Sequence, residues 1–518
     1  YQYARNGINE NEDNKGLRQI FVHTLEKMAR GGVYDQLAGG FHRYSVDERW
    51  IVPHFEKMSY DNSELLKNYV HAYQVTGEEF FADVARDIIR WMDEWLSDRA
   101  HGGFYASQDA DYSMDDDGDY FTWTLDEARS ALSEDEARVA ELRYDIREVG
   151  DMHHNAAKNV LHIRASLEDI ARRLNLTAAQ VGELLASAKQ KMYAARLQRP
   201  TPYVDKTIYT GWNAMCVSAY LAAANAIDLK DARAFALRSL DRLLSEGWHS
   251  EQDTGKADRY PTFRHVIAYS DPNSERRETA GVLEDYAFTI IACLDAYEAT
   301  ADLSYFRFAR EIADAMIAGF HDQNEGGFFD MHISPVDTGA ASSPAASITH
   351  QGILGTPRKP FQDSPTPAGN PVAAIALLRL HSYTNEVSYR EIAEGTLELY
   401  AAAAAQHGIF AATYGLAVAR FTQPHTQVVI IGNDDKAAGL YQAAERSLSL
   451  GTSVMRLDAA KAVAQNLPPV LAETIPHLPA LSSGQSFAVV CSDFACQPPV
   501  FEPTELAGVL EGQARPAA

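Results

Sequence analysis

The chain has 518 residues, of which 46% are hydrophobic, so it can bury more than one ordinary core and is not expected to be disordered. Its 71 acidic residues outnumber 46 basic ones and give a formal charge of −25, which disfavours nucleic-acid and anionic-membrane partners. No apolar run approaches the ~20 residues that a membrane-spanning helix needs. We therefore expect a cytoplasmic protein with small, neutral ligands.

Residues 1–16 are polar and rich in Asn, and they carry no secretory signal, so we expect a lead-in segment. Because Tyr1 stands in place of Met, we expect a fragment or a processed chain. Helical spacing begins at Leu17 and stops at Gly31-Gly32, as at a glycine C-cap.

Residues 37–66 combine many aromatic and titratable side chains with little helical periodicity. Loops loaded in this way are usually held by a rigid scaffold for function, and the alternative is a long connector with solvated charges. A histidine beside a carboxylate can be tuned near neutral pH, so His54 and Glu56 are candidates for proton transfer. A metal site is disfavoured because no spacing here fixes a coordination geometry. The candidate substrate-binding residues of this loop are His42, Arg43, Lys57 and Tyr60.

Beyond this loop, helical patterns come in pairs that form an internal repeat. Asp61 to Gly103 and Asp285 to Gly327 both span 42 positions, and each second member lies in a Gly-Gly-Phe sequence. The predicted pairs are 62–76 with 81–96, a helix that begins near 212 with 232–246, 283–300 with 304–319, and 371–384 with 388–406. Helix pairs repeated at this period predict a solenoid or a closed α/α ring.

In a closed ring, the first helices of the pairs would all start at the same rim. The polar residues at these starts would then converge on one mouth; they are Asp61, Asn213, Asp285 and Asn370. The alternative is that each simply caps its helix, since Asp and Asn are preferred N-caps. Weaker helices are expected within 125–200, and the Pro/Gly/Ser/Ala-rich stretch 333–367 is expected to be a long excursion over one face.

Further carboxylates accompany the first repeat. Asp109 and Asp111 follow its second helix, and Glu284 precedes Asp285 in a later copy. Two carboxylates about 5–9 Å apart are what glycoside hydrolysis requires. Trp212 and Tyr286 could stack on sugar faces, or they could be core residues. The acidic run 115–119 lacks the closing Glu of a calcium loop, so we interpret it as a solvated hairpin tip.

After residue 423 the pattern changes to a small α/β region. Strands are expected at 428–431, 454–457 and 487–491, with a helix over 436–448, and no dinucleotide-binding glycine motif is present. Cys216 and Cys293 lie in apolar helical patterns and should be buried thiols. Cys491 and Cys496 allow a local disulfide, although a reducing cytoplasm would favour free thiols.

Five motifs resemble one known family. They are GGVYDQLAGGFHRYSVDERWIVPHFEKMSYDN, GGFYASQDAD, TGWNAM, LEDYAF and CSDFACQPPV. Together they resemble the thioredoxin-domain-containing family of the spermatogenesis-associated thioredoxin-like protein and its bacterial relatives. The resemblance implies a mainly α fold: an (α/α)6 six-hairpin toroid, like N-acylglucosamine 2-epimerases and several glycosidases, with a small C-terminal α/β region. The family's N-terminal thioredoxin-like domain would precede this chain.

The implied organisation is a lead-in segment at 1–16, the (α/α)6 barrel at 17–423 and the α/β region at 424–518. The leading hypothesis is a carbohydrate-active enzyme, either a glycoside hydrolase or a sugar epimerase or isomerase, that needs no cofactor or metal. Its candidate catalytic residues are His54, Glu56, Asp61, Asp109, Asp111 and Asp285. Its candidate substrate-binding residues are His42, Arg43, Lys57, Tyr60, Trp212, Asn213, Glu284, Tyr286 and Asn370.

The alternative hypothesis is a non-catalytic helical ring that docks or recruits partners for a thioredoxin-like domain, in cis or in trans. The two hypotheses differ in their carboxylates. An enzyme should contain at least one carboxylate or histidine with a strongly shifted pKa in its cavity, whereas a docking ring would use them all for caps and ion pairs.

Overall fold

The computed structural model describes residues 12–114, 118–249, 261–271, 279–332, 357–447 and 451–513. Residues 1–11 of the expected lead-in, the acidic residues 115–117 and positions 333–356 of the expected excursion lie outside the described residues. The chain divides into two compact units: one continues to Ala100 and includes Phe104–Thr207, and the other contains His101–Gly103 and everything from Ile208 onward. The predicted 17–423 barrel thus has parts in both units, and its extent stays a prediction.

The described part of the first unit starts with the helices α2 (Glu12–Arg30), α3 (Ser59–Thr76) and α4 (Glu79–Trp95). The predicted apolar stripe of α4 is buried from Phe81 to Met92, and each such large side chain contributes about 1.5–3 kcal/mol relative to exposure. α3 ends where Gly77 adopts a φ of 71°, the left-handed conformation that glycine permits. α2 starts five residues before the predicted Leu17.

The loop between α2 and α3 is organised by short strands. β1 (Tyr44–Ser45) and β2 (Pro53–His54) form an antiparallel hairpin. β3 (Lys57–Met58) then pairs with β4 (Ser107–Gln108), which also pairs with β5 (Val204–Asp205). These strands hold the polar segment at the entrance to α3.

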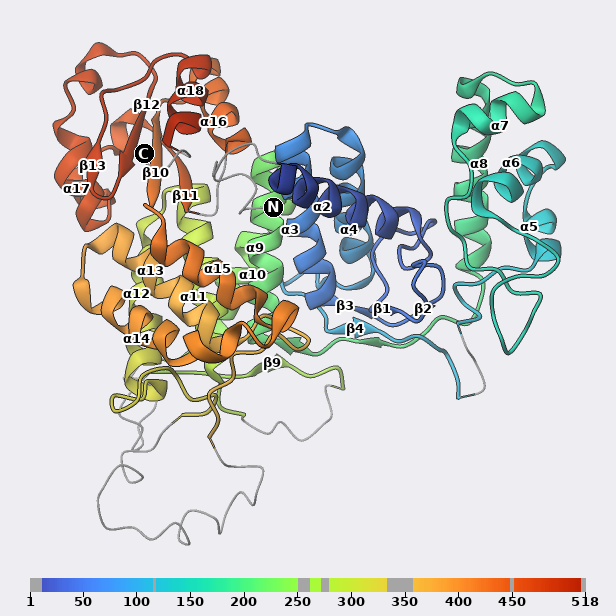
Figure 1. Ribbon diagram of the computed structural model, residues 1–518, viewed down its shortest axis with the longest axis horizontal. Helices are drawn as coiled ribbons and strands as arrows, with labels where there is room; N and C mark the ends of the chain where they lie inside the picture. Colours follow the sequence, from blue (N-terminus) through green and yellow to red (C-terminus); the bar gives the residue numbers. More distant parts are fainter. Residues whose placement is uncertain are drawn as a thin grey trace, which may run out of the picture. The chain divides into compact units, whose positions relative to one another are not determined.

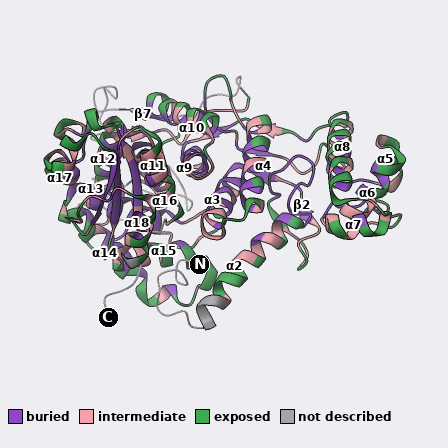
Figure 2. Cartoon of the chain, turned by 90° about the horizontal axis from the view of Figure 1, so that it is seen from above, coloured by how far each residue is buried: buried purple, intermediate pink, exposed green. Residues whose placement is uncertain are grey.

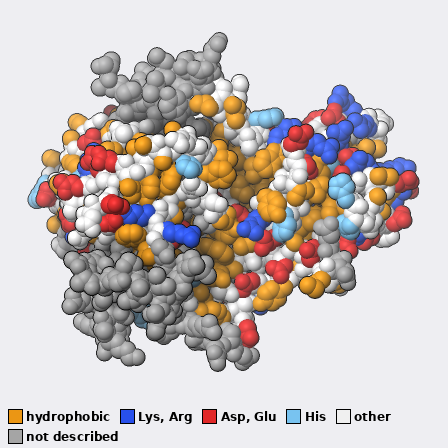
Figure 3. Space-filling view, turned by 60° about the horizontal axis from the view of Figure 1, so that its bottom comes forward, with side chains coloured by type: hydrophobic (Ala, Val, Ile, Leu, Met, Phe, Trp, Pro, Cys, Tyr) orange, Lys and Arg blue, Asp and Glu red, His pale blue; other side chains and the backbone are white. Residues whose placement is uncertain are grey.

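The rest of the first unit is a bundle of α5 (Leu125–Ala131), α6 (Glu134–Tyr144), α7 (Leu167–Leu174) and α8 (Ala178–Arg196). Thr124, Ser133 and Thr177 start three of these helices with capping boxes, which explains how the weak helical patterns become helices. Surface ion pairs such as Arg138–Glu134 decorate the bundle, and Figure 3 shows basic and acidic side chains mixed at this end, drawn at the right. Isolated surface pairs of this kind contribute little to stability.

The second unit contains two layers of paired helices (Figure 1). Its inner helices are α9 (Thr210–Ile227), α11 (Leu283–Thr300) and α13 (Gly369–Thr384). Each is followed by an antiparallel partner, which is α10 (Lys230–Arg242), α12 (Leu303–Phe320) or α14 (Val387–Ala404), respectively. α15 (Ala412–Thr422) comes after α14. α11 packs between α9 and α13, and the inner helices are buried on almost every side, as Figure 2 shows in purple. The predicted helix pairs of this unit are confirmed.

Short strands connect the inner helices at their N-terminal ends. β6 (Ile208–Tyr209) enters α9 and pairs with β9 (Val266–Ala268), while β7 (Trp248–His249) pairs with β8 (Thr262–Phe263). The pairing of β6 with β9 places His265, just before β9, beside the first turn of α9, because Thr210 N donates to His265 O at 2.9 Å.

The C-terminal part of this unit is a sheet in the order β11–β10–β12–β13, comprising β10 (Thr426–Ile431), β11 (Thr452–Leu457), β12 (Phe487–Ser492) and β13 (Ala495–Cys496). Parallel β10 and β11 are connected through α16 (Asp435–Arg446), which packs on the sheet with α18 (Pro503–Gln513), and α17 (Pro469–Thr474) precedes β12. In Figure 1 this sheet lies beside the C-terminal ends of α11 and α13. The predicted strands and helix are confirmed.

The chain is therefore mainly α, built from helical hairpins of the kind found in (α/α)6 toroids, with a small C-terminal α/β region. Cys216 and Cys293 are buried thiols, and Cys491 is bonded to Cys496 across β12 and β13. Within the described residues, no helix is both long enough and apolar enough to span a bilayer.

Candidate functional site

Each inner helix carries a buried Asn or Asp near its start, and these residues hold backbone rather than facing solvent. The four are Asn62, Asn213, Asp285 and Asn370, each no more than 1% exposed. Asn62 Oδ1 accepts from Phe41 N at 2.7 Å and its Nδ2 donates to Phe41 O at 2.9 Å. Asn370 makes the same pair of bonds with Phe328, at 2.7 and 2.8 Å.

These four residues, here called the clamp residues, correct the predicted register by one position. Asp61 was assigned to the set, but Asn62 is the residue that makes the equivalent bonds. The clamped phenylalanines each follow two glycines with positive φ, such as Gly39 and Gly40 at 81° and 74°. The amide of Asn213 donates to Tyr209 O, at the start of its own helix, at 2.9 Å, as that of Asn62 does to Met58 O. Asn62 and Asn370 therefore fasten turns to helix starts.

The residue that precedes each clamp residue differs between the repeats. In the first repeat it is Asp61 and in the third it is Glu284. Burial raises the pKa of both carboxyls to about 7, with a further rise from Glu56 at Asp61 and from Asp285 at Glu284. Two equivalent positions thus carry carboxyl groups that can exchange protons at neutral pH.

In the first unit, Asp61 faces a polar cluster that the sequence had predicted. Arg43 Nη1 donates to Glu56 Oε2 at 2.9 Å, and His54 Nδ1 lies 4.0 Å from the same oxygen. The His54 ring stacks on Tyr44 with 5.1 Å between centroids. Asp61 Oδ2 is buried and has no hydrogen-bond partner among the described residues.

Asp109, after β4, belongs electrostatically to the same cluster. Its pKa is raised by burial and then by the charges of Glu56, Asp205 and Asp111. Asp111 accepts a hydrogen bond from Gly118 N at 2.9 Å, so part of its role is to shape the turn. Tyr60 is buried to 2% exposure and neighbours both Asp61 and Arg43.

Two other predicted residues of this loop point into the protein. Lys57 is fully buried, and its Nζ donates to Asp35 at 2.8 Å and to Gly39 O at 2.9 Å. Asp35 also receives two 2.9 Å bonds from Arg196. His42 Nδ1 bonds Phe55 O at 2.7 Å, and burial with the charge of Lys57 lowers the His42 pKa to about 3. Both side chains are committed to holding the loop rather than offered to a ligand.

In the second unit, Asp285 is the one charged clamp residue among the four. Its Oδ1 accepts from Gly211 N at 2.8 Å and its Oδ2 from Val282 N at 2.9 Å. The same Oδ2 lies 2.8 Å from His265 Nδ1, and this hydrogen bond raises the pKa of His265. The His265 side chain is 32% exposed while that of Asp285 is 1% exposed, so a buried carboxylate presents an accessible imidazole.

An aromatic wall adjoins this pair. The Tyr209 ring lies 4.6 Å from Trp212 and 5.4 Å from His265, and all three side chains are partly exposed. Tyr286 instead packs in the core against Phe263 and Phe320, and its hydroxyl accepts a bond from Phe263 N at 3.1 Å. The predicted wall of Trp212 and Tyr286 is thus formed by Trp212 with Tyr209.

Sequence reasoning missed Tyr209 and His265 because they lie outside the helical repeat, Tyr209 in the short strand β6 and His265 just before β9. Within the described ranges, no group of three or more His, Cys, Asp or Glu side chains is arranged to hold a metal ion.

The chain is similar in sequence to spermatogenesis-associated protein 20. It is 30% identical to the human protein over 527 residues, which are 96% of this chain and 63% of the human protein. It is 32% identical to the mouse protein over 401 residues, which are 73% of this chain and 48% of the mouse protein. The chain thus spans about half to just under two thirds of these relatives. An uncharacterized protein of Caenorhabditis elegans is 26% identical over 74% of the chain. No protein-family model matches.

Solved structures with some similarity are helical sugar enzymes. A D-mannose isomerase matches 80% of this chain and 72% of its own chain, with a TM-score of 0.40 and 13% identity. A glycoside hydrolase family 76 mannosidase of Bacteroides thetaiotaomicron covers 74% and 71%, with a TM-score of 0.41 and 10% identity. A cellobiose 2-epimerase of Spirochaeta thermophila matches 74% of this chain and 84% of its own chain, with a TM-score of 0.38 and 11% identity. Likeness at this level says nothing about what this chain binds.

Proposed function

We propose that this chain is a carbohydrate-active enzyme that works by proton transfer, with His265, Asp285 and Glu284 as its acid–base centre. The observation that carries the proposal is the 2.8 Å bond between buried Asp285 and accessible His265, next to a glutamate whose pKa is about 7. Pairs of titratable groups with pKa values shifted towards neutrality are what general acid–base catalysis requires.

The three residues have different roles. Asp285 binds Nδ1 of His265, so the imidazole presents Nε2 to a reacting group and is stabilised when it is protonated. Glu284 is partly buried and can accept or return a proton near neutral pH. Epimerisation removes a proton from one carbon and returns a proton to its opposite face, and isomerisation delivers it to the neighbouring carbon, so both reactions need groups that accept and donate protons.

Carbohydrate is proposed as the substrate class for two reasons. The rings of Tyr209 and Trp212 lie beside His265, and partly exposed aromatic rings can pack on the apolar faces of sugars. The charge of −25 disfavours highly anionic substrates, whereas a neutral sugar meets no such barrier.

Glycoside hydrolysis is the second candidate, because the first unit places a carboxyl with a raised pKa near an ion-paired carboxyl. Arg43 keeps Glu56 paired at 2.9 Å, while burial and Glu56 raise the pKa of Asp61 to about 7. One ionised and one protonated carboxyl are what hydrolysis of a glycosidic bond needs. Non-catalytic docking for a thioredoxin-like domain is disfavoured by the same two raised pKa values, at Asp61 and Glu284.

The test is ¹H NMR of neutral sugars incubated with the chain in D₂O, starting with mannose and cellobiose. Isomerisation or epimerisation through a solvent-exchanging base introduces deuterium at carbon, whereas hydrolysis creates new reducing-end signals without carbon-bound deuterium. Glu284→Gln and His265→Asn should each lower turnover by about 10²-fold or more.

The matched control is Glu391→Gln, which changes an exposed glutamate on α14 and should leave turnover unchanged. If His265→Asn and Glu284→Gln both retain wild-type turnover, these residues are not the acid–base centre. If only Asp61→Asn and Glu56→Gln lose activity, the hydrolytic candidate is favoured.

A further inference from the structure

The second unit contains a cavity of about 300 Å³ at the opposite end of α13 from the proposed centre. Gly369, at the start of α13, approaches Glu284, whereas His381 and Ser382, near its end, line the cavity. At 1.5 Å per residue these positions are about 20 Å apart along the helix. The two sites are therefore separate.

The cavity has cationic walls in a strongly acidic protein. Arg420 of α15 and Arg390 of α14 contribute guanidinium groups, and His381 and His425 contribute imidazoles. The Arg390 guanidinium is exposed and lies 4.3 Å from the centre of the Phe421 ring, which orients it. Asp493 is the acidic residue in the lining, and its side chain is exposed at the rim.

Arg420 lies in a partly desolvated wall of the cavity, close to a second arginine. Burial, together with the charge of Arg379, lowers the Arg420 pKa to about 10 even though Glu298 and Asp295 oppose this shift. Those two carboxylates are themselves bound to Arg379, at 2.8 and 2.7 Å. A cation in a partly desolvated cavity favours the entry of an anion.

His425 supports this arrangement as a neutral group. Burial and the charges of Arg420 and Arg379 hold its pKa well below the usual range. Its Nδ1 lies 3.4 Å from Arg420 Nη1 and can accept from it, while Nε2 lies 3.4 Å from Ser453 Oγ. The neutral imidazole thus helps to place the guanidinium without adding a competing charge.

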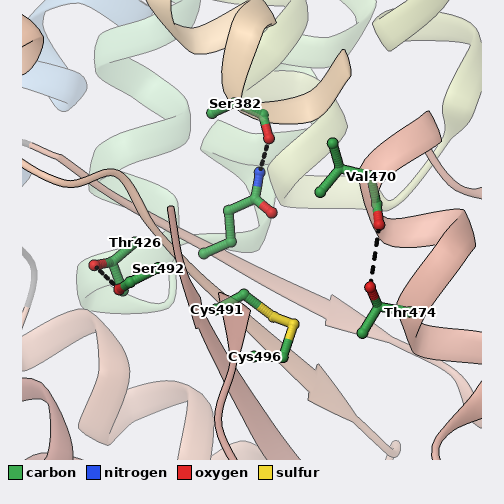
Figure 4. The surroundings of a disulfide bond; sticks show 8 residues. Ser382, Thr426, Val470, Thr474, Cys491, Ser492 and Cys496 are labelled. Atoms are coloured by element: carbon green, nitrogen blue, oxygen red, sulfur yellow. Dashed lines mark hydrogen bonds between the residues drawn. A yellow bond between two sulfur atoms is a disulfide. The ribbon is translucent and has the colours of Figure 1, made fainter. Parts of the chain in front are cut away.

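One side of the cavity is formed by the C-terminal hairpin of β12 and β13. Cys491 lines the cavity and is bonded to Cys496, and between them Asp493 and Phe494 form the turn with φ of 45° and 66°. Phe494 meets the His381 ring edge-on at 5.5 Å. Gln427 Nε2 donates to Ser382 O at 3.0 Å, so β10 and α13 are held together near the disulfide, which Figure 4 shows with Ser382.

We propose that this cavity binds a small organic oxyanion, with Arg420 and Arg390 as the residues that contact its phosphate or carboxylate group. Guanidinium groups match the paired oxygens of both anions in planar, bidentate geometry. The volume lies at the lower end of the range for small-molecule sites, so a compact metabolite fits and a polymer does not.

The test is titration calorimetry of the whole chain with glycerol 2-phosphate and, separately, with malonate, at constant ionic strength set with sodium chloride. Saturable binding of either anion is expected, and the tighter of the two identifies the preferred group. Arg390→Gln should weaken that binding by about tenfold, the value of one charge-assisted hydrogen bond. Asp493→Asn should strengthen it by about two- to fivefold, because a repulsive rim charge is removed.

Arg307→Gln is the matched control, since Arg307 is an exposed arginine on α12 outside the cavity. Arg390 and Asp493 are exposed, so their variants should fold, and thermal denaturation checks this. At position 420 the variant used is Arg420→Lys, because it keeps the buried positive charge. The proposal is overturned if neither anion binds saturably at millimolar concentration, or if Arg390→Gln and Asp493→Asn bind like the Arg307→Gln control. Because the readout is binding, it is independent of activity on sugars.

Discussion

The starts of α3 and α11 occupy the same place in the repeat but have different chemistry. In α3 the clamp residue is Asn62, an uncharged amide whose groups are used by Phe41 and Met58. In α11 it is Asp285, a carboxylate that holds the same kind of turn and also binds His265. A change from amide to carboxylate at one buried position therefore distinguishes a purely structural clamp from one that also positions an acid–base group.

The largest effect should come from charging a structural clamp. In Asn370→Asp, one carboxylate oxygen can still accept from Phe328 N, but the other would face the carbonyls of Phe328 and Pro360. A buried charge without a partner should lower the free energy of unfolding by about 3–5 kcal/mol. Urea denaturation measures this, and a loss below about 1 kcal/mol would show that the clamps tolerate either group.

The reverse change should leave the fold but remove the chemistry. Asp285→Asn keeps an oxygen for Gly211 N, while the charge that raises the His265 pKa is lost. We expect at least about 10²-fold lower turnover on the substrate found by NMR and a lower His265 pKa in an NMR titration. An unchanged His265 pKa would contradict the comparison.

The raised carboxyl pKa values make stability depend on pH in a definite direction. Asp61 has a folded pKa of about 7 against 3.8 for its ordinary value, so the folded state binds the proton more tightly and loses stability as pH rises between these values. Asp61→Asn should therefore be more stable than wild type by about 2 kcal/mol at pH 8, allowing for partial exposure, and equal to it at pH 3. Thermal denaturation at both pH values measures this, and equal stability at pH 8 would mean that Asp61 is well solvated.

The smallest effect concerns His265, whose pKa is raised by Asp285. A group with a raised folded pKa contributes stability that is complete below its unfolded pKa and disappears as pH rises through the folded value. His265→Gln should thus cost about 1 kcal/mol at pH 5 and almost nothing at pH 9, since the side chain is about one third exposed. A cost that is equal at both pH values would indicate a packing role instead.

Helix pairs and strands could be predicted because their signals are local. The stripe of α4 and the glycine that ends α3 follow directly from helical periodicity and from the left-handed conformation that glycine allows. The buried strand β10 was equally visible as an apolar run. Element type and the period of the repeat therefore came from the sequence with little ambiguity.

The roles of individual polar residues could not be predicted, because they depend on distant partners. Lys57 looks like a surface cation until Arg196, 161 positions beyond Asp35, is placed beside that same carboxylate. Asp61 and Asn62 are adjacent polar residues, and only the bond to Phe41 decides which one is the clamp. The pairing of Cys491 with Cys496 is a local contact, but it depends on the two-residue turn that brings them opposite each other, which the sequence alone leaves open.

The shared carboxylate of Asp35 has a consequence for dissecting the first unit. It neutralises Lys57 in the polar loop and Arg196 at the end of α8, and all three side chains are almost completely buried. Removing residues 125–196 would leave the Lys57 ammonium and the Asp35 carboxylate in a space that is otherwise filled by three charged side chains. The α5–α8 bundle is therefore an integral support of that loop, and truncations that omit it should not be expected to yield a folded N-terminal fragment.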